Sequence, residues 1–121
     1  SDIEEKGWSE LTIDDICAAL GGERQCRGDG GREVTEAIAG DLLSFIMGVA
    51  QEGSLWVTIQ AHLNVAAVAV LKDLPMIIIA SGRRAPDDLI ERCKTENITI
   101  LSVPESLYEV CAKLSALGVK G

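Results

Sequence analysis

The clearest pattern in this chain runs from Ser54 to Leu71, where a strand-like segment passes directly into a helix-like one. Residues 56–59 are β-branched and aromatic, which favours a strand, whereas from His62 onward alanine and aliphatic residues predominate without a turn signal. We interpret the second part as a buried helix. Gln60, His62 and Asn64 place three uncharged polar side chains at the junction, where ligands usually bind in a parallel α/β sheet.

A regular alternation of strand-like and helix-like segments extends this pattern. Strand-like runs begin at Leu55, Met76 and Ile98, and each is followed by a segment of helical length. The run 76–79 has no polar alternation, which is typical of an interior strand covered on both faces, so Ile78 should be deeply buried. We therefore predict a three-layer α/β/α domain whose partly parallel sheet has about four or five strands.

Local start and stop signals predict four further helices. Three of them begin at Thr12, at Pro86 and at Pro104-Glu105, and the first and last end at Gly21 and Gly118. The fourth spans residues 42–51 and is expected to be capped by Asp41, with a catalytic role for this carboxylate as the alternative. The residues of this helix expected to face the core are Leu42, Leu43, Ile46, Met47 and Val49.

The glycine-rich segment from Glu23 to Thr35 breaks the helical pattern. Two short strands joined by a turn at Gly28-Asp29-Gly30-Gly31 fit it best. A phosphate-binding loop is the alternative, but the segment lacks a preceding hydrophobic strand and a Gly-Lys-Ser/Thr ending.

Length and charge exclude several classes of protein. The 121 residues suit one domain, which we place at residues 11–118 after a flexible N-terminal segment at 1–10. Apolar residues make up 47%, yet no uncharged apolar run approaches the roughly 18–20 residues of a membrane span. No signal peptide is recognisable, so a cytoplasmic location is expected. A net charge of −8 without a basic cluster argues against nucleic acid and membrane partners.

The four cysteines carry no recognisable metal-binding or redox pattern. Cys17, Cys26, Cys93 and Cys111 form no Cys-x-x-Cys pair, and the chain has a single histidine, so neither a metal site nor a cofactor is predicted. We expect reduced thiols that pack in the core of a cytoplasmic protein.

Parallel strands would bring several polar side chains together at one edge of the sheet. The candidate ligand-binding residues are Thr58, Gln60, His62, Asn64, Ser81, Gly82 and Arg83, with Ser102 beside them. An arginine suits a carboxylate or phosphate, helped by backbone amides at the next helix start. The alternative is that His62 caps a helix and that Arg83-Arg84 is a solvated pair.

Several runs of the sequence resemble the DRTGG domain family, over residues 11–118. They are Gly40-Asp41-Leu42-Leu43-Ser44, the segment from Leu55 to Lys72 and the turn Ser81-Gly82-Arg83. The most similar members are small stand-alone proteins encoded beside iron-only hydrogenases in anaerobic bacteria. The family is similar in fold to the N-terminal domain of HPr kinase/phosphorylase, and many members carry the label "serine kinase" for that reason alone. This chain has no P-loop, which a kinase domain would need.

The name-giving motif of the family is only partly kept. It falls at residues 31–37, where Arg32 and Thr35 match but Gly31 replaces the acidic residue and Glu36-Ala37 replaces the glycine pair. This chain therefore lacks the backbone freedom and the close ligand approach that a glycine pair permits.

The resemblance implies a non-catalytic regulatory or ligand-sensing domain. Such a domain would bind a small anionic or nucleotide-like ligand and act through dimer or partner contacts, with a hydrogenase-associated protein as one partner. The almost entirely apolar helix at 63–71 also favours a homodimer. The alternatives are a small phosphate- or nucleotide-directed enzyme that uses His62 and Arg83, and a purely structural accessory protein.

Overall fold

The computed structural model of this protein describes residues 11–121. These residues form five helices and five strands. Their bounds are α2 (Ile13–Leu20), β1 (Glu23–Cys26), β2 (Ala37–Ala39), α3 (Leu43–Val49), β3 (Leu55–Thr58), α4 (Asn64–Lys72), β4 (Met76–Ile79), α5 (Asp87–Thr95), β5 (Thr99–Ser102) and α6 (Leu107–Leu117). The flexible segment predicted for residues 1–10 lies outside the described residues.

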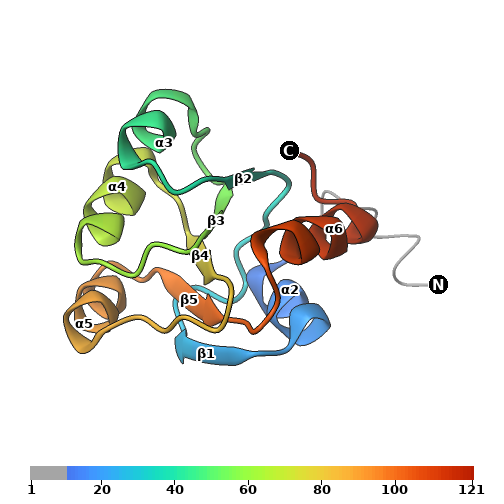
Figure 1. The fold of residues 1–121 in the computed structure, drawn as a ribbon, viewed down its shortest axis with the longest axis horizontal. Coiled ribbons are helices and arrows are strands. Elements are labelled where there is room, and N and C mark those ends of the chain that lie inside the picture. The colour runs from blue at the N-terminus through green and yellow to red at the C-terminus, as the bar shows by residue number, and fades with distance from the viewer. Residues whose placement is uncertain (1–10) are drawn as a thin grey trace.

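The five strands form one mixed sheet with helices on both faces. The strand order is β1-β5-β4-β3-β2, in which β2 to β5 are parallel and β1 is antiparallel to β5. Helices α3, α4 and α5 cover one face of this sheet, and α2 and α6 cover the other (Figure 1). The predicted three-layer α/β/α fold with a partly parallel sheet is therefore confirmed.

The central strands separate two apolar cores. Trp56, Ile77 and Ile79 belong to the core beneath α3, α4 and α5, whereas Val57 and Ile78 belong to the core beneath α2 and α6. Every residue of β3 and β4 is buried, and Ile78 has an exposed fraction of 0%. The absence of polar alternation in residues 76–79 thus correctly indicated an interior strand covered on both faces.

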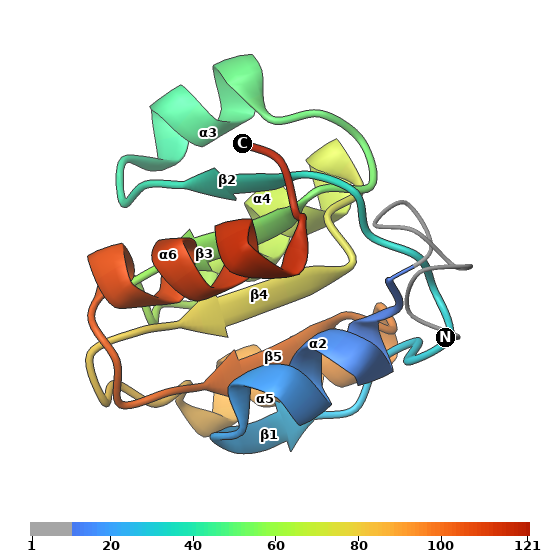
Figure 2. The same ribbon diagram turned by 90° about the vertical axis from the view of Figure 1, so that its right-hand side faces the viewer.

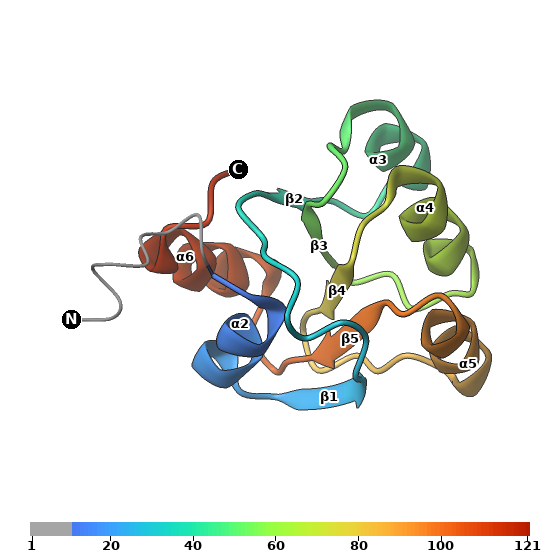
Figure 3. The same cartoon turned by 180° about the vertical axis from the view of Figure 1, so that it is seen from behind.

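The predicted hairpin within Glu23–Thr35 is wrong. Strand β1 lies at one edge of the sheet and β2 at the other, and residues 27–36 cross between the edges beside the start of α2 (Figure 3). On this path the Val34 N–H donates to the Leu11 carbonyl over 2.8 Å. Gly28 has φ +60°, and a Cβ there would lie 2.4 Å from the Thr99 amide nitrogen. The glycines therefore permit a close crossing over β5 and do not form a hairpin turn.

Helix α3 is shorter and more exposed than predicted. It spans Leu43–Val49, and only Ile46 of its residues is fully buried. Leu42, Met47 and Val49, which were expected in the core, have exposed fractions of 68%, 37% and 45%. The physical reason is position: α3 covers the edge strand β2, so only one side of the helix meets the core (Figure 1).

Most of the other helix boundaries follow their sequence signals. Thr12 and Asp15 form a capping box at the start of α2, Pro86 is the N-cap of α5, and Gly118 ends α6 in the left-handed conformation. The start predicted for α6 at Pro104-Glu105 is two residues early, because the Ser106 hydroxyl accepts the Glu109 N–H and provides the cap.

All four cysteines are free thiols in this fold. Cys26 and Cys93 are buried, whereas Cys17 and Cys111 are half-buried. Burial raises the pKa of each thiol, and that of Cys93 reaches about 12. Within residues 11–121 there is no group of three or more potential metal ligands. No helix in this range is long and apolar enough to span a membrane.

At the amino-terminal ends of the parallel strands, an ion pair joins two distant loops. The Arg32 guanidinium donates to both carboxylate oxygens of Asp73 over 3.1 and 2.8 Å, and Asp73 ends α4 with φ 52°. These hydrogen bonds from Arg32 lower the pKa of the Asp73 carboxyl. Because the folded-state pKa lies below the unfolded value, the pair stabilises the fold at neutral pH and loses this effect as the pH falls through the folded-state pKa.

We predict that Asp73→Asn lowers the free energy of unfolding at pH 7 by less than about 1 kcal/mol, because the pair is partly exposed. Asn tolerates the left-handed backbone, so the substitution isolates the charge. Urea unfolding at neutral pH and near pH 3 measures the effect, which should vanish at acid pH. Arg32→Gln should behave alike, and an equal deficit at both pH values would contradict the prediction.

Candidate functional site

The carboxyl ends of three parallel strands meet at one edge of the sheet. Thr58 at the end of β3 pairs with Ile79 of β4, which in turn pairs with Ser102 of β5. The Ala80 N–H continues this alignment by donating to the Thr58 carbonyl over 2.9 Å. The strand ends lie on the left of Figure 2. The parallel arrangement therefore brings the predicted segments of the site to one edge.

Asp41 ties the end of β3 to the loop before α3. Its Oδ1 accepts hydrogen bonds from the Thr58 hydroxyl at 2.9 Å and the Ile59 N–H at 2.8 Å. The Gln60 side-chain amide donates to the Asp41 carbonyl over 3.0 Å. The predicted cap is wrong, because the N-cap of α3 is Leu42 and no side chain caps this helix. The Asp41 carboxylate instead accepts hydrogen bonds from Thr58 and Ile59 at the end of β3.

Thr58 and Gln60 are held by these bonds to Asp41. Thr58 is fully buried, and its hydroxyl oxygen also accepts the Gln60 backbone N–H at 3.0 Å. Gln60 is half-buried. Both residues therefore shape the corner and already have partners within the chain. The second oxygen of Asp41, Oδ2, makes no hydrogen bond within residues 11–121.

His62 stands at the start of α4 and is exposed. Its Nδ1 accepts the backbone N–H of Asn64 over 3.1 Å, so in the neutral ring the proton lies on Nε2, which remains available to a ligand. The N-cap of α4 is Leu63 and no side chain caps this helix, so His62 lies just before the cap and its imidazole accepts the N–H of the first helical residue. The Val65 and Ala66 N–H groups donate to the carbonyls of residues 62 and 63, so these two amides are not available for an anion.

The turn at residues 81–83 is rigid because its amides are bonded to the chain. Ser81 and Gly82 have φ values of 62° and 73°. Their N–H groups donate to the carbonyls of residues 105 and 103 over 2.7 and 2.9 Å, and the Arg83 N–H donates to residue 80 over 3.3 Å. The start of α5 carries Asp87 and Asp88. The amides of this turn are therefore already bonded within the chain, and the helix start that was expected to assist anion binding carries two carboxylates.

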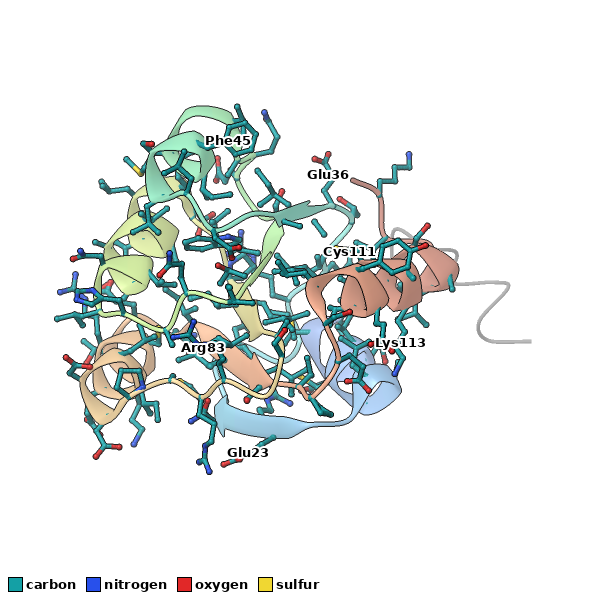
Figure 4. All side chains as sticks on the ribbon, in the orientation of Figure 1. Glu23, Glu36, Phe45, Arg83, Cys111 and Lys113 are labelled. Atoms are coloured by element: carbon teal, nitrogen blue, oxygen red, sulfur yellow. The ribbon has the colours of Figure 1, made fainter. Side chains whose placement is uncertain are left out.

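Arg83 has a free side chain at this edge of the sheet. It is exposed, and its guanidinium makes no hydrogen bond or ion pair within residues 11–121. Its carbonyl accepts the Ser102 hydroxyl at 2.6 Å, which fixes the turn to β5. Arg84 instead pairs with Glu23 at 2.6 Å. Figure 4 shows Arg83 well separated from Glu23.

The predicted side chains thus fall into two groups. Thr58 and Gln60 are engaged internally, whereas His62, Asn64, Ser81 and Arg83 are exposed at the same edge of the sheet. Gly82 shapes the turn that carries Arg83. Hollows of about 180, 310 and 340 Å³ within residues 32–121 are lined by other residues than these.

Asp41 is the residue whose role the sequence did not indicate. It follows strand β2 (Ala37–Ala39), and this strand was not predicted because three residues give too weak a pattern. A strand assigned there would have placed Asp41 at the same edge as Thr58, since parallel strands end together.

Comparisons with known proteins identify a related fold. No protein-family model and no curated protein matches this chain. A solved structure that does match contains the CBS and DRTGG domains of the regulatory region of Clostridium perfringens pyrophosphatase, complexed with the activator diadenosine tetraphosphate. The TM-score is 0.71 at 16% identity, over 90% of this chain and 48% of that chain.

This likeness shows the fold alone. The chain spans about half the length of the pyrophosphatase region and shares the α/β fold of that CBS- and DRTGG-containing structure. The resemblance to the DRTGG family noted in the sequence is supported at the level of fold.

Proposed function

We propose that this chain is a non-catalytic regulatory domain that binds a small anionic, nucleotide-like ligand at the polar corner. The observation that carries the proposal is the free guanidinium of Arg83 at the carboxyl ends of three parallel strands. On a chain with a net charge of −8, an anion needs such a local positive group to approach. The structurally similar region of the pyrophosphatase is complexed with a nucleotide activator, which favours the same class of ligand.

Each exposed side chain of the corner has a distinct role in this proposal. Arg83 pairs with a phosphate or carboxylate, and its planar fork of donors suits either group. The Nε2–H of His62, the Asn64 amide and the Ser81 hydroxyl donate to the remaining oxygens. The free Oδ2 of Asp41 accepts from a hydroxyl such as that of a ribose.

We further propose the setting in which this domain acts. It functions in the cytoplasm as a homodimer and transmits ligand binding to a protein partner, which the family resemblance places in a hydrogenase system. The four thiols with raised pKa values suit a reducing compartment, since none is poised as a reactive thiolate.

An enzyme that uses His62 and Arg83 is the second candidate. It is less favoured because His62 Nδ1 is already bonded to the Asn64 amide, which leaves one ring nitrogen to exchange a proton. Incubation with nucleoside triphosphates and chromatography of the products tests it, and hydrolysis that is lost in His62→Ala would favour the enzyme.

Ligand screening followed by calorimetry tests the regulatory proposal. Thermal unfolding with nucleotides, diadenosine tetraphosphate and inorganic phosphate should reveal a ligand, because binding to the native state raises the melting temperature. Arg83→Ala should weaken binding by about 1.5–3 kcal/mol, roughly 10- to 150-fold, as expected for a charged hydrogen bond. Folding should change by no more than about 0.5 kcal/mol.

Arg84→Ala is the matched control for this experiment. It removes the same charge from the neighbouring residue, whose side chain pairs with Glu23 and not with the proposed ligand. Equal affinities of the wild type, Arg83→Ala and Arg84→Ala would reject the site. Equal losses in both variants would indicate a nonspecific charge effect.

A further inference from the structure

Helix α3 has an apolar stripe on each side. The inner stripe consists of Leu43, Ile46 and Ala50, which face the core. The outer stripe has the same helical spacing and consists of Leu42, Phe45 and Val49, with exposed fractions of 68%, 51% and 45%. A surface helix normally presents polar residues on its outer side, so this second stripe calls for a partner.

The outer side of α4 continues this apolar surface. Helices α3 and α4 pack side by side over the sheet (Figure 1). A hollow between their C-terminal ends is lined by Gly48, Ala50, Gln51 and Leu71, with the charged residues Glu52, Lys72 and Asp73 at this end of the surface. Of the eight large hydrophobic residues exposed within residues 11–121, seven lie on these two helices or at their N-caps. We call this set the α3–α4 surface; its members are Leu42, Phe45, Met47, Val49, Leu63, Val70 and Leu71.

The seven side chains of the α3–α4 surface are uncharged in a strongly charged protein, and charged residues occur only at its C-terminal end. Residues 42–51 and 53–71 contain no Asp, Glu, Lys or Arg, whereas the chain as a whole carries −8. Two copies of the chain would repel each other at most other faces, but they can meet here without burying like charges. A strongly charged partner would gain no electrostatic complementarity from this surface. The charge distribution therefore favours a second copy as the occupant.

Helix α3 also has little stability of its own. It has seven residues, no side-chain cap and a glycine at position 48. A Cβ built on Gly48 meets no atom within 4 Å, so this part of the helix is open to close approach by another backbone. Packing of the outer stripe would stabilise the helix, and Gly48 would permit a short distance between helices.

We propose that two copies of this chain associate through the α3–α4 surface around a two-fold axis, with α3 at the centre of the interface. The inner side of α4 is already covered by the chain, since Val65, Ala66, Val68 and Ala69 are buried. In the sequence, the apolar helix at residues 63–71 predicts a homodimer. In this proposal, helix α3 supplies most of the dimer contact instead. The inference rests on the homodimer of the proposed function and locates its interface; because the surface contains none of the proposed ligand-binding side chains, ligand binding and dimerisation can be tested separately.

Sedimentation velocity and light scattering across micromolar concentrations test this interface. The wild type should have twice the mass of the 12.9 kDa chain. Phe45→Asp should weaken the dimer by at least roughly 100-fold, because a two-fold interface buries each substituted residue twice. Tyr108→Asp is the matched control: Tyr108 on α6 is 83% exposed and lies outside the surface, so this variant should remain dimeric.

Gly48→Arg tests the interface without disturbing the fold of the monomer. Its side chain extends from a position where the chain itself leaves space, so the monomer should fold while the dimer is blocked. Circular dichroism and thermal unfolding check that each variant is folded. A monomeric wild type would overturn the proposal and assign the surface to a different protein. A folded Gly48→Arg or Phe45→Asp variant that stays as dimeric as Tyr108→Asp would overturn it as well.

Discussion

Ile78→Asp is expected to prevent folding of this protein. Ile78 lies in the central strand β4, has an exposed fraction of 0%, and pairs in register with Val57 and Leu101 of the neighbouring strands. Both flanking residues belong to the same core beneath α2 and α6, so a carboxylate there would meet only apolar side chains. An unpaired buried charge costs several kcal/mol, which is comparable with the whole stability of a small domain.

The measurement compares Ile78→Asp with Ile78→Val. The valine variant removes one methylene and should fold with a loss of about 0.5–1.5 kcal/mol in urea unfolding. The aspartate variant should be insoluble, or should lack a cooperative unfolding transition by circular dichroism. A soluble Ile78→Asp protein that unfolds cooperatively would show that β4 is not an interior strand.

The sequence predicted strands β3, β4 and β5 and the helices between them, because the signals for these elements are local. Covered strands such as 76–79 are continuous apolar runs, and the helices after them begin and end at recognisable caps, as at Pro86 and Gly118. The edge strands β1 and β2 have four and three residues, and their places depend on distant partners. For α3, the pattern indicated a helix but could not show which of its two apolar stripes faces the core.

The sequence predicted where the candidate site lies, but not the hydrogen bonds that its residues make. The alignment of Thr58 with Ile79 and Ser102 follows from parallel strands alone. The hydrogen bonds of the Ser81 and Gly82 amides depend on the path of the chain after β5, because their acceptors are residues 105 and 103. No local pattern contains that information, so the sequence could not show that the amides of this turn are already bonded.

Residues 31–37, which resemble the name-giving motif of the DRTGG family, lie at the opposite end of the strands from the polar corner. The retained Arg32 pairs with Asp73 after α4, and the Thr35 carbonyl accepts the Lys120 N–H at 3.0 Å. Neither Glu36 nor Ala37, which replace the glycine pair, has a positive φ. These positions therefore need no glycine in this chain, and the motif region is occupied with contacts that hold the fold together.

Asp41→Ala is expected to lower the free energy of unfolding by about 2–5 kcal/mol. The substitution leaves the buried Thr58 hydroxyl and the Ile59 N–H without the carboxylate that accepts them, and each orphaned donor costs about 1–3 kcal/mol. Asp41→Asn should lose less than about 1 kcal/mol, because its amide oxygen can still accept both bonds. Urea unfolding at neutral pH measures both changes.

A double-mutant cycle with Thr58→Val shows which contact of Asp41 matters. If Asp41 acts through Thr58, the loss in Asp41→Ala plus Thr58→Val should be smaller than the sum of the single losses, with a coupling of about 0.5–3 kcal/mol. A residue that only capped α3 would give additive losses, since Thr58 lies in β3 and is not part of the helix. Strict additivity would therefore restore the helix-cap interpretation. Coupling would establish Asp41 as the residue that fixes the end of β3, and with it the backbone from which Gln60 and His62 project.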